Sequence, residues 1–301
     1  MKNLLILLCF LATSLVKAQT ETLETKIQEI IKDKKAQIGV AVILDSKDTI
    51  TVNNKTQYPT MSVFKFHQAL AVANYLNHKN LPLTTEITIK KEDLKPDTYS
   101  PLCDKYPDGN ISLPVSTLLE YTLQLSDNNA CDILFDYIGG PQVADTYIRS
   151  LGINHFSITA TEEEMQKNLA VCYQNWTTPL EAARLLELLI TREILPTAYQ
   201  DFIKNTMIAC ETGKDRLSKP LLETDAVIGH KTGTGDRNAN GQIIGTNDIG
   251  FVFLPDGYHY TIAVFIKNSE EKSRINSQII ADISEVVYQF ATSSTNSQNP
   301  D

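Results

Sequence analysis

The chain has 301 residues, 42% of them hydrophobic and 21% charged, with 27 basic and 36 acidic side chains and a formal net charge of -9. This composition is typical of a folded globular protein and excludes a disordered or collagen-like chain. The acidic excess argues against a general binder of nucleic acid or of anionic membranes, which would need a cationic surface. The length allows one composite domain or two compact ones.

The first 18 residues have the pattern of a secretory signal peptide, with Lys2, an apolar run over 4–12 and a small-residue cleavage pattern at 16–18. The run is shorter than the ~20 residues that span a bilayer. Cleavage would remove Lys2 and Lys17 and no acidic residue, leaving 25 basic and 36 acidic groups and a formal charge of -11. We therefore expect a periplasmic protein with no membrane attachment after cleavage. The alternative, a lipid anchor on Cys9, is disfavoured by the apolar residues that follow it.

The hydrophobic pattern predicts strands and helices at both ends of the chain around a helical middle. A helix over 25–35 precedes strands over 38–44 and 49–52. Helices are then expected over 61–78, 114–124, 129–138, 141–151, 179–191 and 198–210. Strands return over 227–232, 249–254 and 258–266, with a hairpin turn at Pro255-Asp256-Gly257, before a last helix over 270–291.

The economical arrangement is one antiparallel sheet that both ends of the chain complete, covered by the terminal helices, with the helical block inserted. The predicted units are a signal peptide (1–18), an α/β subdomain (19–58 and 208–293), an all-helical subdomain (59–207) and a loose tail (294–301). A cleft is expected where the two halves meet.

Four cysteines remain after cleavage, Cys103, Cys131, Cys172 and Cys210, and neither they nor the histidines have the spacing of metal ligands. We therefore expect no zinc or iron–sulfur centre. Small buried apolar side chains are the favoured interpretation of the cysteines. Export would permit disulfides without requiring them.

Ser62-Val63-Phe64-Lys65 stands at the predicted start of a helix. The i to i+3 spacing puts both side chains on one face, where a partly desolvated lysine can take the proton of the serine hydroxyl. Backbone N–H groups at the helix N-terminus can stabilise a developing oxyanion. The same pattern begins at Ser14 and at Ser269, so the motif alone does not identify a site.

Two further motifs give the first one its meaning. Ser126-Asp127-Asn128 lies between two predicted helices, and Lys231-Thr232-Gly233 ends a strand predicted to edge the sheet. Each alone is most simply a helix cap or a strand end. In this order and context the three motifs resemble the signature of the serine penicillin-recognising enzymes. The resemblance implies an α/β (α+β) fold of the β-lactamase/transpeptidase type, with a five-stranded antiparallel sheet flanked by helices and an inserted all-helical subdomain.

A fourth segment, Glu162-Glu163-Glu164-Met165-Gln166, resembles the Glu-x-x-Leu-Asn segment of the omega loop in class A β-lactamases. The register picks Glu162, with Met165 at the leucine position and Gln166 replacing the usual asparagine. Without the other motifs an acidic surface loop would be the preferred interpretation. The amino-acid sequences of 61–67 and 173–176 are most similar to the corresponding stretches of the Bacteroidetes cephalosporinases and the PER-type extended-spectrum enzymes.

The class A resemblance implies hydrolysis of cephalosporins and penicillins through an acyl-enzyme on Ser62, conferring resistance. Either Lys65, or Glu162 through a water, would be the base in acylation, and Glu162 would be the base in deacylation. Ser126 would relay a proton to the leaving nitrogen, Lys231 would supply positive potential, and the N–H groups of Ser62 and Thr234 would form the oxyanion hole. The residues expected to bind the substrate or the water are Tyr99, Asn128, Gln166, Arg216, Thr232, Gly233 and Thr234.

Some expectations concern absences and alternatives. Arg216 could equally be an ordinary surface arginine. Met61 and Gly235 occupy the positions of a cysteine pair found in some carbapenem-hydrolysing relatives, so strong carbapenem hydrolysis is not expected. The resemblance implies no metal or organic cofactor and a monomer that takes small-molecule β-lactam substrates and inhibitors.

Three rival functions are open to the same motifs. A D,D-peptidase shares them but lacks the deacylating glutamate, so Glu162 discriminates. A β-lactam-binding sensor needs a membrane link, whereas the only hydrophobic segment here is the leader. A serine esterase would carry Gly-x-Ser-x-Gly, which the sequence lacks.

Overall fold

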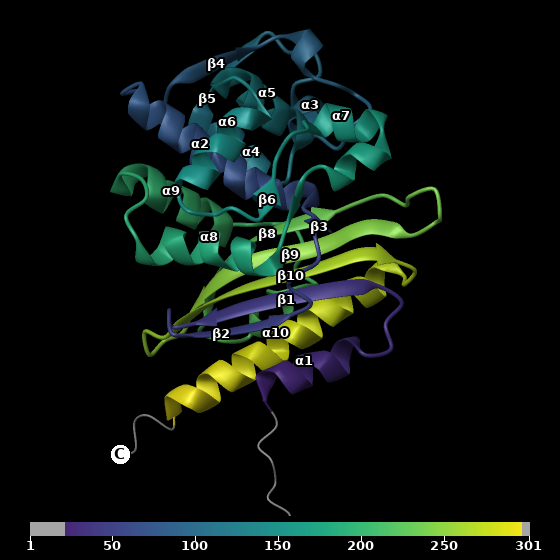
Figure 1. The fold of residues 1–301 in the computed structure, drawn as a ribbon. Helices are drawn as coiled ribbons and strands as arrows, with labels where there is room; N and C mark the ends of the chain where they lie inside the picture. The colour runs from purple at the N-terminus through teal and green to yellow at the C-terminus, as the bar shows by residue number, and fades with distance from the viewer. Residues whose placement is uncertain (1–21, 297–301) are drawn as a thin grey trace, which may run out of the picture.

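The computed structural model describes residues 22–296, which form a sheet, a helical block and the terminal helices (Figure 1). The five-stranded antiparallel sheet has the order β2-β1-β10-β9-β8. Its strands are β1 (Gln37–Leu44), β2 (Asp48–Val52), β8 (Val227–Thr234), β9 (Ile243–Phe253) and β10 (His259–Ser269). The α+β fold predicted from the sequence is confirmed, including the position of β8 at the sheet edge.

Both ends of the chain build this sheet. β1 pairs antiparallel with β10 from Gln37 opposite Lys267 to Leu44 opposite Tyr260, so the N-terminal hairpin is joined to the C-terminal strands. α1 (Leu23–Ile31) and α10 (Ser273–Asn296) pack against each other on one face of the sheet. α8 (Pro179–Thr191) covers the other face, next to the helical block (Figure 1).

The helical block is built around α2 (Phe64–His78), in which eleven of the 15 residues are buried. A helix that is buried on nearly all sides shows little amphipathic pattern, as its sequence does. The other helices are α3 (Pro101–Lys105), α4 (Val115–Gln124), α5 (Asn128–Ile138), α6 (Pro141–Ser150), α7 (Glu162–Lys167) and α9 (Thr197–Ile208). Two small sheets complete the block, one of β3 (Tyr58–Pro59), β7 (Trp176–Thr177) and β6 (Phe156–Ser157), the other of β4 (Glu86–Ile89) and β5 (Ile111–Pro114).

Two hydrophobic cores lie on opposite faces of the large sheet. Val40 and Val42 of β1 join the core beneath α1 and α10. Ala41 and Ile43, which alternate with them, join the core that continues into the helical block. The helical block therefore has no separate core of its own.

The structure corrects several predicted bounds. β9 begins at Ile243, six residues before the expected start, because Gly245 interrupts the apolar run without ending the strand. The omega-loop stretch, which has no clear sequence periodicity, contains the short helix α7. α10 continues through residue 296 into the tail predicted to be loose. The hydroxyl groups of Thr292 and Ser293 donate to carbonyls one turn earlier, so these polar side chains find partners within the helix.

The predicted subdomain boundaries both fall within observed elements. The boundary between residues 58 and 59 falls inside β3, and the one between 207 and 208 falls in the last turn of α9. We therefore propose that the helical subdomain begins after β3 and ends with α9. The predicted signal peptide, 1–18, lies outside the described residues. Between residues 22 and 296, no helix combines the length and apolarity that a membrane crossing requires. The four cysteines in this range form no disulfide with one another.

One buried group in the helical core titrates far from its usual pH. The His67 ring in α2 is 1% exposed and lies 5.9 Å from the Phe156 ring, measured between centroids. Burial lowers the pKa of His67 from 6.5 to about 4, against weaker opposing effects of the Val63 carbonyl and Asp145. The folded protein therefore keeps this histidine neutral at pH values where the unfolded chain protonates it.

We predict that His67→Leu removes part of the acid sensitivity of the fold. Between pH 6.5 and about 4 the unfolded chain binds a proton that the folded chain does not, so stability falls as the pH falls. This shift makes the wild type about 2 kcal/mol less stable at about pH 5 than at about pH 7.5. Urea unfolding at both pH values should show a smaller loss for the variant. His78→Leu, at the exposed end of α2, should lose as much as the wild type, and an equal loss in His67→Leu would contradict the assignment.

Candidate active site

Ser62 and Lys65 lie at the junction of a 3-10 turn (Met61–Val63) and α2. Lys65 Nζ is 3.3 Å from Ser62 Oγ, the contact that the i to i+3 spacing predicts. Met61, just before the serine, has a φ of 46°. A left-handed methionine is a strained residue that the surrounding structure must hold in place.

The Lys65 ammonium has 0% side-chain exposure, and oxygen atoms from two other segments surround it. Nζ lies 2.9 Å from Glu162 Oε1, 2.7 Å from the Ser126 carbonyl oxygen and 2.6 Å from Asn128 Oδ1. A buried charge is tolerated when it is paired and hydrogen-bonded in this way. Lys65 thus brings together the omega segment, the Ser-Asp-Asn loop and the start of α2.

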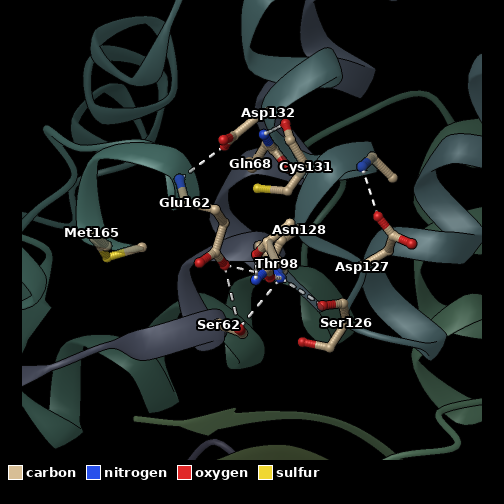
Figure 2. Close-up of polar contacts among 12 residues, drawn as sticks. Ser62, Gln68, Thr98, Ser126, Asp127, Asn128, Cys131, Asp132, Glu162 and Met165 are labelled. Atoms are coloured by element: carbon tan, nitrogen blue, oxygen red, sulfur yellow. Dashed lines mark hydrogen bonds and ion pairs between the residues drawn. The ribbon is translucent and has the colours of Figure 1, made fainter. Parts of the chain in front are cut away.

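Glu162 begins α7 and points at the serine. Ser62 Oγ donates to Glu162 Oε1 over 3.3 Å, as Figure 2 shows. Thr161 and Glu164 form a capping box at this end of the helix, which fixes the backbone of Glu162. Glu162 is 8% exposed, unlike the solvated surface acid that its sequence context alone would suggest.

Asp132 holds the Glu162 backbone from the side of α5, and sequence reasoning missed it. Its two carboxylate oxygens accept the N–H groups of Glu162 and Glu163, each over 2.8 Å. Burial, followed by the charge of Glu162, raises the pKa of Asp132 to about 7. The signal was present in the sequence, because Asp132 is four residues after Asn128 and therefore on the same helical face.

Asn175, which sequence reasoning also missed, connects the omega segment to the turn that carries Ser62. Its Oδ1 accepts the N–H groups of Thr159 and Ala160, over 2.8 Å and 2.9 Å. Its backbone carbonyl accepts both the N–H and the hydroxyl of Thr60, two residues before Ser62. The side chain also contacts Met165 through the sulfur atom. Glu162 and Ser62 are thereby positioned by one fully buried asparagine.

The Ser126-Asp127-Asn128 loop is held by its middle residue. Asp127 is fully buried and caps α5 by accepting the Ala130 N–H, and it also accepts the Ser100 hydroxyl and the Leu102 N–H. Ser126 has a φ of 62°, a second strained residue at this site. Asn128 meets Lys65 through Oδ1 and donates from Nδ2 to Thr98 Oγ1 over 2.7 Å.

Lys231 faces the same cleft from β8. Nζ donates to Ser126 Oγ over 2.9 Å, and the residue is fully buried. Burial lowers the pKa of Lys231 to about 8, assisted by the positive charge of Lys65 and opposed by nearby anions. Gly233 is required at the strand end, since a Cβ there would lie 2.6 Å from the Thr60 carbonyl oxygen and 3.3 Å from Ser62 N. The close approach puts the backbone of β8 beside Ser62.

Arg216 is buried behind the end of β8 rather than on the surface. It is 8% exposed, donates to the carbonyls of Gly233 and Asn247, and donates to Thr234 Oγ1 over 2.7 Å. Thr232 is also buried, and its Oγ1 lies 2.6 Å from Thr212 Oγ1. The guanidinium can therefore orient the exposed Thr234 hydroxyl and add positive charge beneath it.

These residues enclose a cleft with two lobes that share Ser62, Tyr99, Asn128 and Thr234. One lobe, about 290 Å³, is lined by Glu162, Met165 and Gln166, and the other, about 280 Å³, by Ser126, Arg216 and Thr232. Tyr99 is 59% exposed at the opening. The Gln166 amide donates to the Asp97 carbonyl across the cleft, so the structure gives it a partner on the facing loop. No three acidic, histidine or cysteine side chains within 22–296 are placed to hold a metal ion.

Comparisons with known proteins agree on one family. A sequence model of the β-lactamase enzyme family matches residues 22–291. A β-lactamase of Bacteroides uniformis is 40% identical, over 95% of this chain and 96% of the relative. The extended-spectrum β-lactamase PER-1 of Pseudomonas aeruginosa is 36% identical, over 94% and 92%. The crystal structure of a class A β-lactamase from Bacteroides cellulosilyticus superposes with a TM-score of 0.86 at 43% identity, covering 90% of this chain and 97% of that one.

We predict that Asp127→Ala destabilises the fold, because this carboxylate holds the loop at the edge of the cleft together. The substitution leaves three buried donors without their acceptor, which should lower the free energy of unfolding by roughly 3 kcal/mol in urea titration. Asp127→Asn keeps one acceptor oxygen and should cost less. Asp136→Ala, an exposed position on the same helix, should be nearly neutral. An Asp127→Ala variant as stable as Asp136→Ala would contradict the role of this carboxylate.

Proposed function

Because the chain belongs to the β-lactamase enzyme family as a class A serine β-lactamase, we propose that it hydrolyses cephalosporins and penicillins through an acyl-enzyme on Ser62. Water activated by Glu162 cleaves that ester. The observation that carries the proposal is the contact of Ser62 Oγ with Glu162 Oε1 and Lys65 Nζ, at 3.3 Å each. A nucleophile, a carboxylate base and a buried cation thus meet at one point.

In acylation, Glu162 is the base that the resting geometry favours. An ammonium group has three N–H donors and no acceptor. Lys65 Nζ lies within 3.0 Å of three oxygen acceptors, which fits a charged amine that donates. The Ser62 hydroxyl donates instead to Glu162 Oε1. Lys65 then stabilises the alkoxide that forms as the proton moves to the carboxylate or to a water beside it.

The oxyanion and the leaving nitrogen are served by β8 and the Ser-Asp-Asn loop. The N–H groups of Ser62 and Thr234 form the oxyanion hole in the proposal, supported by the close packing of Gly233 on the Ser62 backbone. Losing one such donor typically costs ~2.7–4 kcal/mol of transition-state stabilisation. Ser126 relays a proton to the β-lactam nitrogen, and the donation from Lys231 leaves the Ser126 hydroxyl proton free to point at that nitrogen.

The substrate carboxylate is bound in the lobe lined by Arg216, Thr232 and Thr234. Arg216 donates to Thr234 Oγ1, so the threonine proton remains available to a carboxylate. Lys231 adds a second positive charge. A local field of this sign is needed because the whole chain has a formal charge of -9, which opposes an anionic substrate. Asn128 orients the acylamino side chain after exchanging its contact with Thr98.

Deacylation depends on Glu162 acting on a water between the carboxylate and the ester. Asp132 and Asn175 support this role by fixing the backbone on either side of the glutamate. Gln166, on the next turn of α7, is the second proposed holder of the water, through its carbonyl oxygen, since its amide nitrogen contacts Asp97. We further propose periplasmic export, resistance to β-lactams, a monomeric state and a preference for cephalosporins, the last by similarity to the extended-spectrum enzyme PER-1.

We predict that Glu162→Ala converts the enzyme into a slow acyl-enzyme. Loss of a general base should reduce kcat for a chromogenic cephalosporin by about 100-fold to 10,000-fold. Mass spectrometry should detect a covalent adduct on Ser62 that persists after mixing. Rapid kinetics should show a stoichiometric burst before the slow phase, because the substitution slows deacylation more than acylation.

The matched control is Glu163→Ala, one residue along the same helix turn, where the carboxylate pairs with Lys167 at the surface. It should retain nearly full kcat. A reversed pattern would move the catalytic role from Glu162 to its neighbour. A wild type that forms an adduct without turnover would instead favour a penicillin-binding peptidase.

We predict an alkaline limb in the pH profile of kcat/KM that belongs to Lys231. Its pKa is lowered to about 8, so the positive charge near the substrate carboxylate is lost as the pH rises through this value. The KM for an anionic cephalosporin should rise accordingly. In Lys231→Arg the guanidinium stays charged, so the limb near pH 8 should disappear whatever the absolute activity. A limb that persists unchanged in the arginine variant would assign it to another group.

A further inference from the structure

Behind the substrate lobe, Cys210, His230 and Asp248 form a chain of titratable side chains that the proposed reaction does not use. Cys210 follows the end of α9 and is partly exposed, whereas His230 and Asp248 are buried on β8 and β9. Among the neighbours of Cys210, His230 does most to lower the pKa of its thiol. His230 Nδ1 lies 3.0 Å from Asp248 Oδ1, which orients the ring and favours its charged form.

The surroundings of the Cys210 sulfur are electropositive. The cations that act on it are His230, Lys231 and Arg216. Burial alone would raise the pKa of Cys210, but the hydrogen bond and charge of His230 outweigh it and lower the pKa to about 7. Burial alone would lower the pKa of His230, but Asp248, with a smaller contribution from Cys210, raises it to about 10, so the imidazolium stays charged over the same range. Carbonyl oxygens of Gln124 and Thr212 also lie near Sγ, at 3.9 Å and 3.7 Å.

The other described cysteines have the opposite character. Burial raises the pKa of Cys172 to about 11 and that of Cys131 well above its usual value. Cys103 is partly exposed, like Cys210, yet its pKa is also raised, by partial burial and by the charges of two aspartates. The neighbouring charges therefore distinguish Cys210 from Cys103. Reactive cysteines are thiolates in partly exposed electropositive sites.

Cys210 is also connected to the substrate lobe. Its Sγ is 3.4 Å from Thr212 Oγ1, which in turn is 2.6 Å from Thr232 Oγ1. The segment that carries Thr212 packs tightly against Thr232, because a Cβ on the adjacent Gly213 would lie 2.4 Å from Thr232 Cγ2. A group added to the sulfur must therefore displace Thr212 or the segment that carries it.

We propose that Cys210 is a modification site at which small anionic disulfides attach and, by displacing Thr212 from Thr232, weaken substrate binding. The Cys210 thiolate attacks one sulfur of R–S–S–R and forms Cys210–S–S–R. The other sulfur leaves as R–S⁻ and takes a proton from water, while His230 keeps its own. The cysteine is oxidised and the disulfide is reduced, so no further oxidant is needed. The effect on binding rests on the proposed function of Thr232, whereas the attachment does not.

The test uses dithiodiglycolate, the anionic disulfide of mercaptoacetate, at pH 7, with peptide mass mapping. A pKa near 7 gives Cys210 at least about 50-fold more thiolate than Cys103, whose pKa is raised above its usual value. The lower nucleophilicity of such a thiolate reduces the rate advantage to at least about fivefold. The cationic disulfide cystamine should label Cys210 more slowly than dithiodiglycolate does. His230→Asn should slow the labelling of Cys210 and leave Cys103 unaffected.

Labelling should raise the KM for a chromogenic cephalosporin by about tenfold, the loss of one hydrogen bond to a carboxylate, and dithiothreitol should reverse it. Cys210→Ser should keep the unlabelled activity and resist the reagent, while Cys103→Ser should remain sensitive. Preferential labelling of Cys103, or a Cys210 adduct with unchanged KM, would overturn the proposal. Unlabelled Thr232→Val distinguishes failure of the proposed function from failure of the attachment. An unchanged KM in this variant contradicts the function of Thr232 and leaves the attachment at Cys210 unaffected.

Discussion

A single buried charge organises the site. The Lys65 ammonium is not exposed to solvent, so its charge must be stabilised by oxygen atoms of Glu162, the Ser126 carbonyl and Asn128. These oxygens come from α7 and from the Ser126-Asp127-Asn128 segment at the start of α5, which are far from each other and from Lys65 in the sequence. Folding must bring all three to one nitrogen before the charge is compensated. The same contacts place Ser62, Glu162 and Ser126, the proposed nucleophile, base and proton relay, so the cost of burying the charge and the order of these groups have one origin.

Around this charge, the backbone adopts conformations and close approaches that most side chains would not allow. Met61 and Ser126 have left-handed φ values, and Gly233 allows β8 to lie against the turn that carries Ser62. Asn175 satisfies the backbone on both the omega side and the nucleophile side. Such strain is sustained by buried hydrogen bonds elsewhere. The positions of Glu162 and Ser62 are therefore set by groups that never touch the substrate.

Hydrophobic periodicity predicted the sheet and most helices, and the three signature motifs indicated the site, because periodicity and motifs can be recognised from the sequence alone. They could not predict how Asp132 and Asn175 act, since their roles depend on backbone N–H groups 15 to 31 residues away along the chain. Arg216 was left undecided between surface and site for the same reason, as its burial depends on β8 and β9 closing over it. The start of β9 was missed because a glycine within a strand resembles a turn.

The core that runs from the helical block to the inner face of the sheet also bears on how the enzyme can adapt. Two lobes with separate cores can rotate about a hinge, but here any such rotation would expose apolar surface shared by both. The catalytic slot is therefore of nearly constant width. New substrates must be accommodated at its rim, by Tyr99 and by the contact between Gln166 and the Asp97 loop, where a change of conformation disturbs no core residue. Evolution of a broader substrate range should accordingly leave α2 and the sheet unchanged and act on these edges.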